Sequence, residues 1–101
     1  MLEANEGLEN IFENAVKEAE KRKHEYVTIE HVLLSLIKNK QIGTVLTDFK
    51  VNVGALIKDI QDYLDTKCTD IITKSDKPVA PRKTASLERL MNRAFTQALF
   101  Q

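Results

Sequence analysis

The chain has little of what builds disulfide-bonded, turn-rich or membrane-spanning proteins. Among its 101 residues there are one cysteine, two prolines and three glycines. A single cysteine, Cys68, excludes an internal disulfide and fits a reducing cytoplasm. Few glycines and prolines disfavour a turn-rich β fold. No apolar run approaches the roughly 18–20 residues of a membrane span. The acidic N-terminus lacks the order of a secretory signal. We therefore expect a cytoplasmic protein without a membrane segment.

The chain also has no excess of positive or negative charge, because 15 Lys and Arg balance 15 Asp and Glu. A net charge of zero gives no overall attraction to nucleic acid or to anionic membranes. The short basic runs, Lys21–Lys23 and Arg82–Lys83, carry no interleaved aromatic residues. The first run comes late in an expected helix, where positive charge favours the helix dipole. Nucleic-acid binding through these runs is therefore the weakest of the functions considered.

What is present is apolar spacing typical of amphipathic helices. It predicts helices over residues 8–22, 28–38, 43–49 and 53–64, and a last helix beginning near Thr84 or Ser86. Thr28 and Asn52 stand where N-caps belong. The third helix is expected to offer Val45, Leu46 and Phe49 to the core. Short connections predict an all-α orthogonal bundle of about five helices.

The domain organisation follows from a break and a repeat. Residues 66–83 contain both prolines and many polar residues, and indicate an extended connector. The apolar pattern of residues 8–19 recurs at residues 87–98, at an offset of about 79. We predict one domain over residues 1–101, made of a first repeat (8–65), the connector (66–83) and the start of a second repeat (84–101). The last helix would then be partly uncovered, which favours self-association or docking.

Catalysis is not expected. The candidate chemical residues are His24, Glu25, Glu30, His31 and Cys68. The two histidines are seven residues apart across a loop, so they do not form the i, i+4 metal pair of H-E-x-x-H. The cysteine lies in the predicted connector with no evident base partner. No catalytic residue, resident metal or cofactor is predicted, and zinc at His24 with a nearby carboxylate is an alternative.

One stretch carries a family resemblance. His24 is followed by Thr28-x-Glu30-His31 and then by Leu-Leu-x-Leu-Ile over residues 33–37. This pattern resembles the amino-terminal domain of the Clp family of ring-shaped unfoldases, nearest to ClpA and ClpC. The resemblance covers roughly residues 8–100 and includes residues 45–64. It implies a pseudo-duplicated all-α module, in agreement with the repeat. No GxxxxGK[ST] phosphate-binding loop is present, so the motor is not expected here. The chain is then either a free-standing, shortened relative or a fragment, and we expect the former.

The resemblance also implies site residues. Glu25 and Thr84 match positions that contact the small adaptor ClpS in the ClpA branch. Glu30 matches an acidic position implicated in phosphoarginine recognition in the ClpC branch. The threonine that would assist Glu30 in the first repeat is absent, which argues against that activity. With Tyr26 and Thr28, these residues form the predicted partner-binding set. The alternatives are that Glu25 is an ordinary solvated charge and that Glu30 only supports the start of its helix.

These observations favour a non-catalytic protein-binding module. The expected partner is a ClpS-like adaptor, a Clp unfoldase or a substrate of the protease machine, and the chain would regulate proteolysis in trans. The alternative is a structural half-domain that forms a homodimer to complete its repeat.

Overall fold

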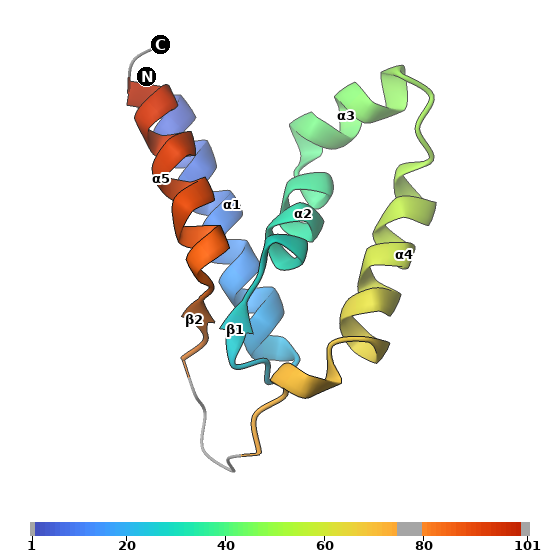
Figure 1. Ribbon diagram of the computed structural model, residues 1–101. Helices are drawn as coiled ribbons and strands as arrows, with labels where there is room; N and C mark the ends of the chain where they lie inside the picture. The colour runs from blue at the N-terminus through green and yellow to red at the C-terminus, as the bar shows by residue number, and fades with distance from the viewer. Residues whose placement is uncertain (1, 75–79, 100–101) are drawn as a thin grey trace.

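The computed structural model describes residues 2–74 and 80–99, with side chains described for residues 6–74 and 80–97. The prediction of an all-α bundle is confirmed. The helices are α1 (Leu2–Lys21), α2 (Ile29–Lys38), α3 (Lys40–Asp48), α4 (Val53–Thr66) and α5 (Ala85–Leu99), with a 3-10 turn at Thr69–Ile71. Two short strands, β1 (Tyr26–Val27) and β2 (Arg82–Lys83), pair in parallel. In Figure 1, α2 lies between the α1–α5 pair and the α3–α4 pair.

The first hydrophobic core joins α1, α2 and α5. Ala15 and Ala19 of α1 are completely buried, and their small side chains let α2 approach closely. The rings of Phe12 and Phe95 lie 5.6 Å apart, which joins α1 to α5. The apolar stripes predicted for the first and last helices therefore face each other. Ala98, the last member of the predicted stripe, lies outside the residues with described side chains.

The second core lies between α2 and α4. Leu34 and Leu64 are almost fully buried there, with Cys68 at 8 % exposure. Isoleucines of α4 and the 3-10 turn pack around them. In α2 the apolar residues Val32, Leu34 and Ile37 are buried, whereas Leu33 is 41 % exposed. Cys68 lies within the range predicted as the connector, and its side chain belongs to this core.

The third helix corrects the sequence interpretation. It begins at Lys40, because the Asn39 side chain accepts hydrogen bonds from the N–H groups of Gln41 and Ile42. Residues 40–42, which lie between two of the predicted helices, are therefore part of α3. Val45 is 51 % and Phe49 79 % exposed, and α3 has no buried residue. Its expected contribution to the core is wrong for both residues, since this short helix lies at the edge of the molecule (Figure 1).

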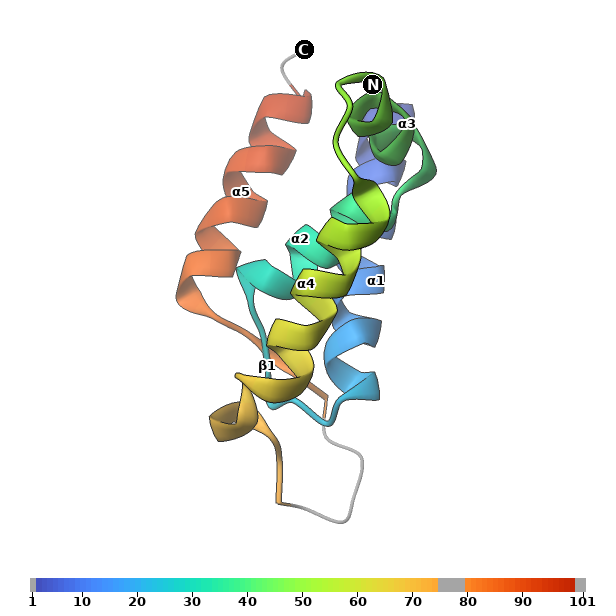
Figure 2. The same ribbon diagram turned by 90° about the vertical axis from the view of Figure 1, so that its right-hand side faces the viewer.

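The connector is more ordered than expected in the part that the structure describes. After the 3-10 turn, Ile72 forms an antiparallel bridge with His24. Arg82 and Lys83 then add a strand beside β1. Residues 75–79, including Pro78, lie outside the described residues. Figure 2 shows the 3-10 turn and β1 at one end of the molecule and α3 at the other.

Candidate protein-docking surface

Strand pairing brings the two predicted halves of the partner-binding set together. Tyr26 is opposite Arg82 and Val27 is opposite Lys83 in the parallel pair. The N–H of Thr84 donates to the carbonyl oxygen of Val27 at 3.2 Å. Each strand leads directly into a helix, so the starts of α2 and α5 lie next to each other. The segments that carry Glu25, Tyr26 and Thr28 and that carry Thr84 are therefore neighbours, although 56 residues separate the two threonines in the sequence.

The two threonines begin their helices in different ways. Thr84 Oγ1 accepts a hydrogen bond from the N–H of Leu87 at 3.1 Å, as an N-cap side chain does. At the start of α2 the Thr28 N–H donates instead to Nδ1 of His31, at 2.9 Å. The residue three positions after the cap thus reaches back, which is half of a capping box with histidine in the place of glutamate. Thr28 as N-cap is confirmed.

A shallow hollow of about 250 Å³ opens at the strand pair. Glu25, Tyr26, Ala80 and Arg82 line it, and Tyr26 is 40 % exposed. Carboxylate, phenol and guanidinium groups in one hollow can hydrogen-bond and form ion pairs with a polar partner segment. Sequence reasoning missed Arg82 as a member of this site, because only the pairing with β1 places it beside Tyr26.

Glu30 lies on another side of α2. Burial raises the pKa of the Cys68 thiol, and the charge of Glu30 raises it further. Glu30 also contributes to the raised pKa of Tyr63 on α4, after the contribution of Cys68. These effects place Glu30 on the α4 side of α2, whereas the hollow lies beside β2. The structure therefore does not place Glu30 among the residues that line the hollow with Glu25 and Tyr26.

Beneath β1 the two histidines form a buried pair. His24 Nδ1 and His31 Nε2 are 2.8 Å apart, and the two side chains are 2 % and 0 % exposed. Desolvation lowers the pKa of His31 to about 4, and the nearby His24 and Arg22 add to this effect. Both imidazoles are therefore neutral at pH 7. Their mutual bond uses Nδ1 of His24 and Nε2 of His31, so these two nitrogens are not free to bind a metal ion together.

Ion pairs fix the end of α1 against its neighbours. Arg22 binds Glu18 at 2.8 Å and Asp65 of α4 at 2.7 Å, and Lys38 of α2 binds Glu18 at 3.1 Å. Burial alone would raise the pKa of Glu18, but the hydrogen bonds from Arg22 and Lys38 outweigh it and lower that pKa. Glu18, Arg22 and Lys38 thus form ion pairs within the fold.

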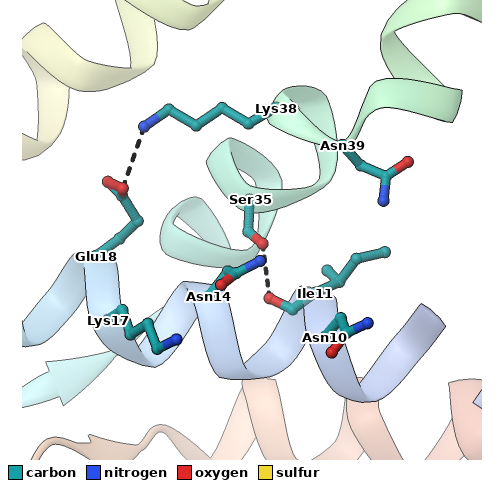
Figure 3. Close-up of a pocket in the computed structure, with 8 residues that line it drawn as sticks. All are labelled: Asn10, Ile11, Asn14, Lys17, Glu18, Ser35, Lys38 and Asn39. Atoms are coloured by element: carbon teal, nitrogen blue, oxygen red, sulfur yellow. Dashed lines mark hydrogen bonds and ion pairs between the residues drawn. The ribbon is translucent and has the colours of Figure 1, made fainter. Parts of the chain in front are cut away.

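A second hollow, of about 240 Å³, lies between α1 and α2 and contains none of the predicted site residues. Figure 3 shows Asn10, Asn14 and Lys17 on α1 and the Lys38–Glu18 ion pair at one end. The Ser35 hydroxyl donates to the Ile11 carbonyl oxygen at 2.6 Å, which ties α2 to α1 across the floor. Its buried polar groups thus serve helix packing.

The remaining candidate chemistry has no geometric support. Among the described residues, no three His, Cys, Asp or Glu side chains are grouped to hold a metal ion. Cys68 is buried and burial raises its pKa, so it is a thiol rather than a nucleophilic thiolate. None of the helices in the described part of the chain is long and apolar enough to cross a membrane.

Comparison with known proteins identifies the family of the chain. Residues 3–99 match the family described as the Clp repeat (R) N-terminal domain. A protein of Fuscovulum blasticum described as a ClpA homolog is 31 % identical over 87 residues. That alignment covers 86 % of this chain and 11 % of the relative, so the chain corresponds to a small part of the relative's length. The chain belongs to the Clp repeat N-terminal domain family.

Proposed function

We propose that the chain is a non-catalytic protein-binding module that binds an adaptor of the ClpS type. The observation that supports the proposal is the parallel pairing of β1 with β2, which brings the half-buried Thr84 near the segment that carries the exposed Glu25 and Tyr26. A substrate or an unfoldase of the same protease machine is the other partner class. By occupying the adaptor, the module would regulate proteolysis in trans.

The surface suits a partner with hydrogen-bond donors and a positive charge. Glu25 is exposed and accepts such groups, and the Tyr26 ring supplies an amphipathic contact beside it. Arg82 at the other side of the hollow favours a partner that also carries a carboxylate or a carbonyl group. Charges at the edge of an interface act mainly on partner choice and association rate.

Binding of a purified ClpS-type adaptor, measured by calorimetry, tests this proposal. We expect the double variant Glu25→Ala with Thr84→Ala to bind at least tenfold more weakly, because it removes a charged acceptor and a hydroxyl. Glu13→Ala, which removes an exposed glutamate from the middle of α1, is the matched control and should bind normally. Adaptor that fails to bind, or binds the double variant equally well, contradicts the proposal.

Thr84 has a structural role as well, so its effect must be separated from folding. Removing the cap hydroxyl is expected to lower the free energy of unfolding by about 1 kcal/mol. Thr84→Ser keeps the oxygen that accepts from Leu87, and should restore both stability and binding. If the serine variant restores stability alone, the threonine methyl group contacts the partner.

Self-association is the second candidate function, favoured by an exposed apolar side chain on α5. Leu90 is 39 % exposed, although its counterpart in the repeat, Ile11, packs in the first core. Ser35 of α2 is bonded to the Ile11 carbonyl oxygen, so α2 lies over that part of α1. We infer that a second copy of the chain would bury the equivalent face of α5.

A further inference from the structure

The buried histidine pair has a single hydrogen-bonding arrangement. A backbone N–H can only donate, so Nδ1 of His31 must accept from Thr28 at 2.9 Å and carries no proton. The proton of neutral His31 is therefore on Nε2, where it is donated to Nδ1 of His24 at 2.8 Å. His24 in turn carries its proton on Nε2. The Thr28 hydroxyl, also 2.9 Å from Nδ1 of His31, faces the same unprotonated nitrogen.

This arrangement closes the segment that carries the docking residues. His24 is fixed to the end of α1, because its backbone N–H donates to the Ala19 carbonyl oxygen at 2.9 Å. His31 is in the first turn of α2. The imidazole bond thus joins the two ends of residues 24–31, with Glu25 and Tyr26 on the exposed side and the pair buried beneath them.

Protonation of either ring is incompatible with this geometry. A proton on Nδ1 of His24 would face the Nε2 proton of His31. A proton on Nδ1 of His31 would face the Thr28 N–H. In both cases two hydrogen-bond donors face each other in a buried place, which is unfavourable. Opening residues 24–31 to water removes this unfavourable contact.

We propose that His24 and His31 are positioning residues of the docking surface, whose neutral pairing holds β1 in place and whose protonation releases it. That this surface binds a partner rests on the proposed function. The release of β1 is a property of the free chain and does not depend on that function. It adds regulation by acid to a site formed from exposed residues.

The surrounding charges set the direction of the pH dependence. Burial lowers the pKa of both rings, and Arg22 at the end of α1 lowers both further. Asp65 of α4 raises that of His24, while Glu30 and Glu18 raise that of His31, without outweighing burial. The pKa of His31 falls from 6.5 to about 4. The stabilisation by the neutral pair is thus complete above about pH 6.5 and is lost as the pH falls toward 4.

Amide hydrogen exchange of the free chain, residues 1–101, tests the release. We expect the protection factor of the Thr28 amide, corrected for intrinsic exchange, to fall roughly tenfold or more between pH 6.5 and 4.5. The matched control is the Ala55 amide, which bonds to the Asn52 side chain at the start of α4 without a titratable partner. Its protection should stay constant. Equal behaviour of the two amides overturns the proposal.

Two further measurements separate positioning from a merely structural role. Long-range proton–nitrogen spectra at pH 7.5 should show both rings protonated on Nε2, and a Nδ1 proton on His31 overturns the proposal. His31→Gln supplies a carboxamide oxygen to the Thr28 N–H, as in a glutamine capping box, but cannot titrate. Its Thr28 protection should be independent of pH, and protection that still falls with acid overturns the assignment to this pair.

Partner binding then completes the test. The affinity of the adaptor for the wild-type chain should fall between pH 6.5 and 4.5 more steeply than its affinity for His31→Gln. Parallel pH profiles would overturn the regulation. If the exchange results hold while no adaptor binds at any pH, the proposed function fails and the acid-sensitive pair remains.

Discussion

Lys50 shows how a single residue can be at odds with the conformation that the fold requires. Its φ of 63° lies in the left-handed region, as does the φ of 58° at Lys23. Both lysines follow the last turn of a helix, and the next N–H returns to the helix in each case: Val51 to Leu46, and His24 to Ala19. These are Schellman ends, in which glycine is the preferred residue.

Replacing Lys50 by glycine should therefore stabilise the chain. We expect the free energy of unfolding to rise by about 0.5–1 kcal/mol, because glycine adopts positive φ without a steric penalty. Lys58→Gly, at an exposed position in the middle of α4, is the matched control and should lose about 1 kcal/mol. Urea denaturation at 25 °C measures both. If both variants changed the free energy of unfolding in the same direction, the interpretation that positive φ at Lys50 is unfavourable would be contradicted.

At the scale of the element, helical spacing predicts which residues share a face, and the neighbours decide whether that face is covered. Helix α3 has the same amphipathic character as the other helices, yet none of its residues is buried. Helix α2 has neighbours on both sides, α1 and α4, and its Val32, Leu34 and Ile37 are buried. The sequence could predict both helices but not this difference.

The difference can be measured by truncating one apolar residue in each environment. Phe49→Ala, at the exposed C-cap of α3, should change the free energy of unfolding by no more than about 0.5 kcal/mol. Leu64→Ala in α4, where the side chain is 1 % exposed, should lose about 2–5 kcal/mol by leaving a cavity. A large loss for Phe49→Ala would mean that α3 packs against a surface in solution, and a dependence on protein concentration would identify that surface as a second copy.

At the scale of the whole molecule, two cores share α2, and α5 joins the rest through the first core and the strand pair. The exposed Leu90 lies on the face of α5 that corresponds to the α2-covered face of α1. A stable dimer buries roughly 1,200–2,000 Å² in total, which is more than one such side chain supplies, so association through this face should be weak.

Sedimentation equilibrium from about 10 µM to 1 mM tests this association. We expect a dimer to appear only toward the upper end of the range, since the buried area is small. Leu90→Glu should abolish it, and Val45→Glu, on the exposed face of α3, is the matched control that should leave it unchanged. A strict monomer at every concentration removes the self-association hypothesis.

The sequence by itself determined the all-α class, the amphipathic helices, the caps at Thr28 and Asn52, and the family resemblance. These properties depend on neighbours within a few residues, which spacing and residue type reveal. The division into repeat, connector and second repeat stays a prediction, as do the individual contacts of Glu25, Thr28 and Thr84 with a partner.

Only the tertiary structure decided which of those local features meet. The pairing of β1 with β2 involves two residues in each strand, too few to leave a periodic signal, and it joins segments more than 50 residues apart. That pairing places Arg82 beside Tyr26 and Thr84 beside Val27. The His24–His31 bond depends in the same way on how the end of α1 meets α2. Local sequence sets the faces of the helices, whereas long-range contacts decide which side chains form a site.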